Sequence, residues 1–262
     1  MSILEQILEV KRKEIILLKQ NRRVKEYDDS SLLYKPTLSL INTIRKSRDI
    51  SIIAEVKKAS PSKGIFIDNF DHLDIAVEYF KNGADAISVI TDEQFFKGSI
   101  DHLHDIALIK NKPLLRKDFI IDESQVFQAR ENGADAILLI CEALEKESIR
   151  KLTKTAQLLG MDVLLELHAI DQISKIDFSL NKLIGVNNRD LTTFITDLKT
   201  TEVIRRQLPD DILLVSESGI KDKDDIARVR DAGCDAVLVG EHFIRSASIG
   251  GALREMKEWC RG

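Results

Sequence analysis

A short motif that occurs three times constrains the fold of this 262-residue chain more than any other feature. The sequence NGADAI starts at residue 82 and again at residue 132, and the variant AGCDAV starts at residue 232. Each copy ends a helical pattern, contains a glycine suited to a left-handed helix cap, and leads into an apolar run. The copies start 50 and then 100 residues apart, so one period of that length fits two strand–helix units.

Eight apolar runs without polar alternation predict strands that are covered on both faces. They span residues 51–56, 86–90, 112–115, 136–140, 163–167, 183–186, 212–215 and 236–239. Amphipathic stretches between them predict helices, among them 122–131, 145–159, 196–207 and 222–231. Strands that alternate with helices over short connections predict a parallel sheet with right-handed crossovers. Eight such units favour an α/β fold of the (β/α)8 TIM barrel type over an open doubly wound sheet.

We expect one barrel domain over residues 1–262, in which residues 1–50 form an N-terminal helical extension. The length is that of one barrel, and no linker rich in glycine, serine or proline marks a second domain. The extension contains residues spaced for one apolar helix face: Ile3, Leu4, Ile7, Leu8, Ile15 and Leu18. This helix either closes one end of the barrel or shapes the substrate pocket, and the sequence leaves both open.

Composition narrows the class of partner. A net charge of −4 gives no reason to expect nucleic acid. No stretch approaches the roughly 18 continuous apolar residues of a membrane helix, and the first residues do not have the order of a secretory signal. Three widely separated cysteines, Cys141, Cys234 and Cys260, predict reduced thiols in a cytoplasmic protein rather than disulfides or a metal site.

The sequence lacks the common motifs for metal and nucleotide binding. The five histidines include no HExxH pair, and no carboxylate–histidine cluster has evident metal spacing. The sequence contains neither a GxxxxGK[ST] loop nor a GxGxxG fingerprint. We therefore expect no metal and no nucleotide cofactor.

The end of the first predicted strand carries two charged residues. Glu55 and Lys57 are two residues apart, so their side chains leave the same face of the strand, while Ala54 and Val56 face the helices. In a barrel of this type the active site lies where the strands end. Burying a carboxylate and an ammonium group is costly unless they pair or take part in chemistry. A purely structural ion pair remains the alternative, and the loop that follows suits a flexible substrate loop.

Other strand ends carry further polar residues, namely Lys117, Glu166, Asn187, Arg189 and Glu217. Each one alone could be a solvated charge or a capped strand end, but together with Glu55 and Lys57 they converge on one end of one barrel. A lysine surrounded by carboxylates keeps its proton, and a glutamate in an apolar wall has a raised pKa and is a better base. The cluster therefore predicts acid–base chemistry.

Glycines that follow the last two strands indicate a phosphate site. Ser218 and Gly219 follow the seventh strand, and Gly240 follows the eighth. In barrels of this type, phosphate groups commonly bind to backbone N–H groups of these two loops. We expect the substrate to be a phosphorylated small molecule.

These segments resemble the indole-3-glycerol phosphate synthase family. IAEVKKASPSKG (53–64) is similar to the family signature, and RKDFI (116–120), LELH (165–168), GVNNRD (185–190) and SESGI (216–220) resemble its later motifs in the same order. The resemblance covers nearly the whole chain, including the extension. Two departures are Asp190, where many relatives have asparagine, and Glu241, whose carboxylate we expect to point away from a bound dianion.

The resemblance implies an enzyme of tryptophan biosynthesis that uses neither metal nor cofactor. The substrate would be 1-(2-carboxyphenylamino)-1-deoxyribulose 5-phosphate, and ring closure with loss of CO2 and water would give indole-3-glycerol phosphate. Lys117 would be the general acid, Glu166 the base in dehydration, and Lys57 a proton donor to the departing hydroxyl. Glu55 would orient the lysines or bind hydroxyls, and Asn187 and Glu217 would complete the polar wall. The implied substrate-binding residues are Ser60 and Arg189 for polar and anionic groups, Phe96 and Phe119 for the aromatic ring, and Ser218, Gly219 and Gly240 for phosphate.

Two alternatives stay open. The first is a barrel similar to phosphoribosylanthranilate isomerase, which normally needs a Cys/Asp pair, but no cysteine ends the first strand here. The second is a catalytically inactive barrel that acts as a partner-binding subunit. Such a barrel should have lost one of Glu55, Lys117 and Glu166, and all three are present. The sequence does not indicate an oligomeric state.

Overall fold

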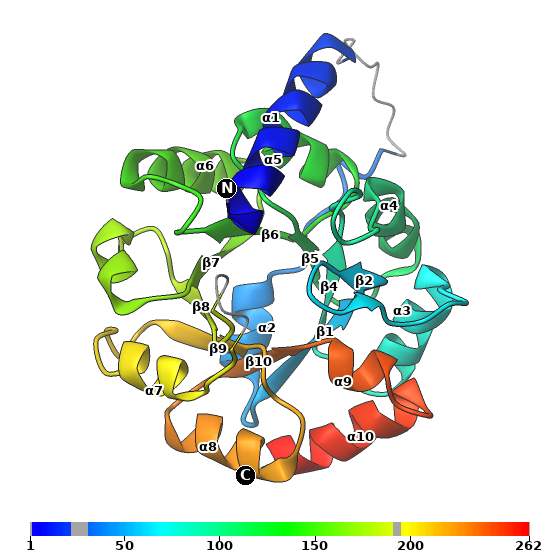
Figure 1. Cartoon of the computed structure of the whole chain (residues 1–262), viewed down its shortest axis with the longest axis vertical. Coiled ribbons are helices and arrows are strands. Elements are labelled where there is room, and N and C mark those ends of the chain that lie inside the picture. The colour runs from blue at the N-terminus through cyan, green and yellow to red at the C-terminus, as the bar shows by residue number, and fades with distance from the viewer. Residues whose placement is uncertain (1, 22–30, 191–194, 262) are drawn as a thin grey trace.

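The computed structural model describes residues 2–21, 31–190 and 195–261. Eight parallel strands close into a barrel in the order β1-β10-β9-β8-β7-β6-β5-β4 (Figure 1). The barrel strands are β1 (Ser51–Val56), β4 (Ala86–Ile90), β5 (Leu114–Lys117), β6 (Ala136–Ile140), β7 (Asp162–Leu167), β8 (Leu183–Asn187), β9 (Leu213–Glu217) and β10 (Ala236–Val239). This closed ring confirms the predicted (β/α)8 TIM barrel.

Helices surround the ring in Figure 1, and short helical segments complete the loops. They are α3 (His72–Lys81), α4 (Ile100–Ile109), α5 (Glu123–Glu131), α6 (Lys146–Leu158), the 3-10 helix η1 (Ile170–Lys175), α7 (Lys199–Arg205), α8 (Lys223–Asp231), α9 (Glu241–Ile244) and α10 (Ile249–Cys260). Within the described residues, no helix combines the length and the apolar character that crossing a membrane requires.

Two predicted elements begin two or more residues later in the structure than the sequence predicts. The third strand begins at Leu114 rather than at residue 112, because Pro113 has no N–H to donate to a neighbouring strand. The helix predicted over 196–207 covers only Lys199–Arg205. Thr196 instead forms an antiparallel bridge with Arg189, and the Asp197 carboxylate accepts the N–H of Lys199 at the start of the helix.

The strands place alternate side chains in two apolar layers. Ala54 and Val56 of β1 pack in the layer between the strands and the helices. Ile53, which precedes Ala54 and points to the opposite face, packs with Leu115 and Leu164 in a second layer inside the barrel. Because successive side chains point to opposite faces, Glu55 follows Ile53 toward the interior.

The aspartate of each repeated motif forms hydrogen bonds with the start of a neighbouring strand. Asp85 accepts the N–H of Ile52 at 2.8 Å, Asp135 that of Leu114 at 2.9 Å, and Asp235 that of Leu214 at 2.7 Å. The backbone N–H of each aspartate donates back to the carbonyl oxygen of that same residue. The glycine of each motif has a positive φ between 81° and 98°, as the predicted left-handed cap requires. The repeat therefore fixes the register at the amino ends of the strands.

The N-terminal segment reaches both ends of the barrel. The short helix α2 (Leu40–Lys46) inserts Leu40 and Ile44 into the inner layer, next to residues that begin strands, such as Leu183 and Leu213. The longer helix α1 (Ile3–Asn21) contacts α5, as its position in Figure 1 also shows, and lies at the opposite end of the barrel. The sequence left two roles open for the extension, closing one end of the barrel and shaping the substrate pocket. In the structure α2 has the first role, and α1 lies at the end that has the second.

We predict that Asp135→Ala lowers the free energy of unfolding by about 2–4 kcal/mol. The Asp135 side chain is fully buried, and its carboxylate accepts the N–H groups of Leu38 and Leu114 and pairs with Lys110 at 2.6 Å. Removing the carboxylate leaves these donors without a partner. Urea unfolding monitored by circular dichroism measures the loss. Asp210→Ala, at an exposed position, is the control, and equal stability of the two variants would contradict the proposed locking role.

Candidate active site

A cavity of about 850 Å³ lies at the carboxyl ends of the barrel strands. Its volume is within the range that suits a small organic ligand. All thirteen site residues predicted from the sequence line it: Glu55, Lys57, Ser60, Phe96, Lys117, Phe119, Glu166, Asn187, Arg189, Glu217, Ser218, Gly219 and Gly240. The structure thus brings them together, and their individual roles remain predictions.

The Lys117 ammonium lies between two buried carboxylates. Its Nζ is 2.9 Å from Oε2 of Glu166 and 3.6 Å from Oε2 of Glu217. The two glutamate side chains are only 3% and 2% exposed, and that of Lys117 is 17% exposed. Asn187 donates a long hydrogen bond of 3.5 Å from Nδ2 to Oε1 of Glu166. One cation and two carboxylates therefore share a site that is almost closed to water.

This arrangement shifts the pKa values of Glu166 and Glu217 in opposite directions. Burial alone would raise the pKa of Glu166, but the Lys117 ammonium outweighs it and lowers this pKa to about 2. Burial, together with the charge of Glu166, raises the pKa of Glu217 well above its usual range. Burial alone would lower the pKa of Lys117, but Glu166, Glu217 and Glu55 together raise it. The expectation of a raised pKa is thus wrong for Glu166, because Lys117 is its neighbour, and it fits Glu217.

A glycine in β8 makes room for the Glu217 side chain. A Cβ atom on Gly185 would lie 2.2 Å from Oε1 of Glu217 and 3.3 Å from a methyl carbon of Leu164. Real Cβ atoms do not approach other atoms that closely, so a larger residue here would force the Glu217 carboxyl to move from this position. Neither Glu217 oxygen accepts a hydrogen bond from the described part of the chain, which fits a carboxyl that holds its own proton.

A second ion pair lies beside the first. Nζ of Lys57 is 2.5 Å from Oε2 of Glu55, and both side chains are largely buried. A Cβ atom on Gly240 would lie 2.7 Å from the same Glu55 oxygen, so the backbone after β10 approaches this pair closely. The alternation predicted for the first strand is therefore realised, with both charged groups facing the cavity.

One wall of the cavity is apolar. The rings of Phe96 and Phe119 have centroids 6.1 Å apart at a tilt of 39°, and both line the cavity. Ile3, Leu4 and Ile7 of α1 line it as well. The extension therefore contributes directly to the site.

The side of the cavity near α9 carries cations and unusual backbone. The Glu241 carboxylate accepts hydrogen bonds from Lys63 at 2.7 Å and Arg245 at 3.1 Å, and it lies 3.8 Å from Arg189. Glu241 thus lines the cavity, but its charge is turned to these three cations. Ser218 and Gly219 after β9 both have positive φ, 64° and 86°. Successive backbone N–H groups of a turn can form an anion-binding concavity.

The loop after β1 is partly ordered by hydrogen bonding. The sequence predicts a flexible segment here, but β2 (Ala59–Ser60) and β3 (Gly64–Ile65) pair as a short antiparallel hairpin. Lys63, at the turn of this hairpin, reaches Glu241 of α9. The loop is therefore tied to the far side of the cavity.

Three residues with clear structural roles at the site were missed by sequence reasoning. Lys11 of α1, Asp92 after β4 and Asp118 after β5 form a buried ionic cluster next to the aromatic wall. Lys11 interrupts the apolar face of α1 four residues after Ile7 and four before Ile15. A charge at the centre of an apolar helix face was the available signal.

Neither cysteine chemistry nor a metal cluster is evident. Cys141, Cys234 and Cys260 are buried free thiols, and none of them lines the cavity among the described residues. In the same part of the chain, no three His, Cys, Asp or Glu side chains are grouped so that they could hold a metal ion.

We predict that Glu217→Gln changes how stability depends on pH. The native pKa of Glu217 is raised, so above the unfolded-state value of 4.5 the folded protein holds more protons, and stability falls as pH rises toward the native pKa. Glutamine mimics the protonated form and does not titrate. The free energy of unfolding of the variant, relative to the wild type, should therefore increase steadily from about pH 5 upward.

Urea unfolding at a series of pH values between 5 and 8 measures this difference. Glu166 does not interfere, because its lowered pKa affects stability only below pH 4.5. Glu9→Gln on α1 is the control, since that side chain is exposed. A difference between wild type and Glu217→Gln that stays constant over this range would disprove the raised pKa.

Comparisons with known proteins agree on one family. The family model described as indole-3-glycerol phosphate synthase matches residues 4–256. A relative of that name from Acetivibrio thermocellus is 48% identical over 225 residues, which are 86% of each chain. Another from Chlorobium luteolum is 43% identical over 252 residues, which are 96% of each chain.

Solved structures support the fold alone. 3-Hexulose-6-phosphate synthase superposes with a TM-score of 0.61 at 16% identity, over 80% of this chain and 99% of that one. KGPDC from Streptococcus mutans gives 0.63 at 12% identity, over 82% and 98%. Because the family model and the curated relatives match almost the whole chain, the chain belongs to the indole-3-glycerol phosphate synthase family.

Proposed function

We propose that the cavity performs the reaction for which the family is named, as a carboxy-lyase of tryptophan biosynthesis. The substrate is 1-(2-carboxyphenylamino)-1-deoxyribulose 5-phosphate, and the products are indole-3-glycerol phosphate, CO2 and water. One observation carries the assignment of the reacting centre. The Lys117 ammonium is held between the buried carboxylates of Glu166 and Glu217, with an aromatic wall on one side and a group of cations on the other.

Ring closure joins the ring carbon that bears the carboxylate to the ketone carbon of the sugar. The ketone oxygen gains negative charge as this bond forms, and Lys117 donates a proton to it. The raised pKa of Lys117 keeps the donor fully charged, and an alkoxide is a strong enough base to take its proton. Loss of CO2 then returns an electron pair to the ring and restores its aromaticity.

Dehydration completes the indole. Lys57 donates a proton to the hydroxyl group, which leaves as water, and Glu166 removes a proton from the neighbouring carbon. The lowered pKa of Glu166 keeps this carboxylate ionised and able to accept a proton at neutral pH. Glu55 orients Lys57 through their 2.5 Å contact, while Asn187 and Glu217 fix the position of Glu166 and Lys117.

The remaining groups bind the substrate at its two ends. Phe96 and Phe119 enclose the aryl ring, and Ser60 and Arg189 bind its polar and anionic groups. The backbone at Ser218, Gly219 and Gly240 binds the phosphate, supported by nearby cations. The phosphate therefore lies on the side of the cavity that carries Lys63, Arg189 and Arg245, although the net charge of the chain is −4.

An isomerase activity has less support than the synthase activity. Proton transfer by a Cys/Asp pair would need a thiol at the cavity, and the three cysteines are buried elsewhere. Burial also raises the pKa of Cys141 to about 12, so this thiol is unreactive. A non-catalytic subunit would not need the paired charges described above.

We further propose that the protein works in the cytoplasm as one barrel domain, binds no nucleic acid and uses no cofactor.

We predict that Lys117→Ala lowers kcat by roughly 100- to 10,000-fold, because the variant lacks the proton donor for ring closure. Purified protein is mixed with the carboxyphenylamino-deoxyribulose phosphate without metal or nucleotide, and indole fluorescence is followed. Wild-type protein that is folded but gives no signal would refute the proposed reaction. Near-normal turnover by the variant would remove Lys117 from the acid role.

The matched control is Lys223→Ala, at an exposed position on α8, which should retain wild-type turnover. Circular dichroism and urea unfolding establish that Lys117→Ala is folded under the assay conditions. The Glu166 carboxylate can take up a proton once the ammonium is gone, so we expect the variant to fold.

A further inference from the structure

We propose that Lys11 is a positioning residue that holds the aromatic wall of the cavity in its binding geometry. The proposal rests on the proposed function only in assigning Phe96 and Phe119 to the aryl ring of the substrate. Lys11 belongs to α1, outside the barrel, and its side chain is only 2% exposed. It therefore acts through other residues rather than on the reacting atoms.

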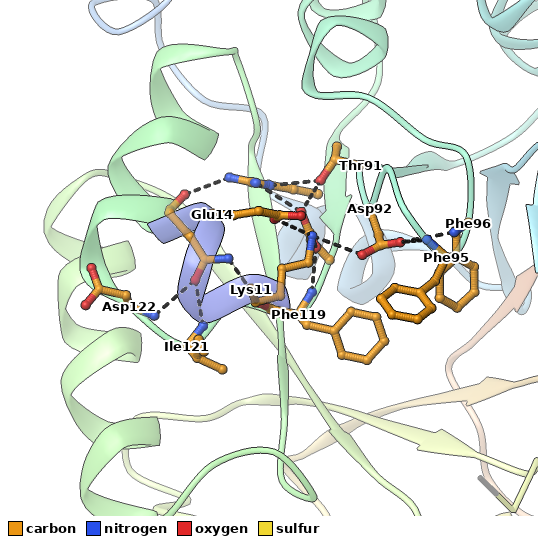
Figure 2. Close-up of polar contacts among 12 residues, drawn as sticks. Lys11, Glu14, Thr91, Asp92, Phe95, Phe96, Phe119, Ile121 and Asp122 are labelled. Carbon is orange, nitrogen blue, oxygen red and sulfur yellow. Dashed lines mark hydrogen bonds and ion pairs between the residues drawn. The ribbon is translucent and has the colours of Figure 1, made fainter. Parts of the chain in front are cut away.

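The Lys11 ammonium bridges two loops of the barrel. Its Nζ lies 3.0 Å from Oδ2 of Asp92 in the loop after β4, and 3.0 Å from Oδ1 of Asp118 in the loop after β5. Glu14, on the next turn of α1, is a third partner at 2.9 Å. Figure 2 labels Lys11 together with two of these partners, Glu14 and Asp92.

Each bridged aspartate holds one aromatic residue of the wall by its backbone. Oδ1 of Asp92 accepts the N–H groups of Phe95 at 2.8 Å and Phe96 at 3.0 Å. Oδ1 of Asp118 accepts the N–H of Phe119 at 2.8 Å. The two carboxylates that fix the backbone of Phe96 and Phe119 are thus fixed to each other by one ammonium group.

The second carboxylate oxygen of Asp118 is also held in place. Oδ2 of Asp118 accepts hydrogen bonds from Arg116 at 3.0 Å and Thr91 at 2.6 Å. Burial by itself raises the pKa of Asp118, but Arg116 and Lys11 outweigh it and lower the pKa to about 2. Asp118 is therefore ionised at any physiological pH, and its charge requires both cations.

The same lysine anchors the apolar residues of α1 that line the cavity. Leu4, Ile7 and Lys11 lie on one face of α1, since they are separated by three and four residues. Leu4 and Ile7 line the same cavity as Phe96 and Phe119. An apolar residue at position 11 would let α1 pack against the barrel. It would not fix the distance between the loop after β4 and the loop after β5. The ionic bridge does, because ion pairs and hydrogen bonds depend on direction and distance.

This role predicts a defect in ring binding that is separate from chemistry. In Lys11→Met, KM should rise by about tenfold, while kcat stays within about twofold of the wild type. Lys117 keeps its own partners, Glu166 and Glu217, so its proton transfer is not disturbed. The binding constant of 2-aminobenzoate, which represents the aryl end, should weaken by the same factor as KM. The binding constant of inorganic phosphate should not change.

Lys110→Met is the matched control. Lys110 is another largely buried lysine, paired with buried Asp135 at 2.6 Å at the opposite end of the barrel. This variant should lose stability while it retains wild-type KM and both binding constants. Calorimetric titration gives the two binding constants without turnover. An inactive wild type that still binds 2-aminobenzoate would therefore refute the reaction and leave the positioning role measurable.

Asp92→Asn provides an independent test if Lys11→Met does not fold. Asparagine can still accept the N–H groups of Phe95 and Phe96 through its oxygen, but it loses the charge that holds Lys11. We expect the same selective loss of 2-aminobenzoate binding by a smaller factor. Unchanged binding of both probes in the folded variants overturns the proposal, and so does an equal loss of both.

Discussion

Closure of the sheet is the constraint on which the rest of the structure depends. In a closed parallel barrel every strand points the same way, so eight carboxyl ends meet around one small area. Charged residues that are far apart in the sequence are thereby forced into contact. The contact is tolerable because their charges alternate. Lys117 lies against Glu166 and Glu217, and Lys57 lies against Glu55, so each charge of this cluster has a partner of opposite sign.

Pairing also determines what each group can do chemically. Glu166 at the end of β7 and Glu217 at the end of β9 differ in protonation, because Lys117 is closer to Glu166 than to Glu217. Gly185 contributes by admitting Glu217 into the barrel interior. Position within an ionic cluster, rather than residue type, thus separates the proton acceptor from the carboxyl that keeps its proton.

Much of this site could be predicted from the sequence because barrel strands alternate with a period of two. Once Glu55 and Lys57 are placed on the inner face, the other strand ends follow by the same rule. The pKa of Glu166 could not be predicted, since it depends on which neighbour lies nearest across the barrel. Lys11 was missed for a related reason. A helical pattern identifies the buried face of α1, but it does not say that two aspartates from distant loops meet that face.

The two ends of the barrel carry separate tasks. The repeated aspartates and α2 close and align the amino ends of the strands, whereas the charged and aromatic residues occupy the carboxyl ends. A protein engineer could therefore rewrite the loops that bear the chemistry while the aspartate-locked base keeps the scaffold folded. The threefold motif marks the portion of the sequence that such redesign should leave alone.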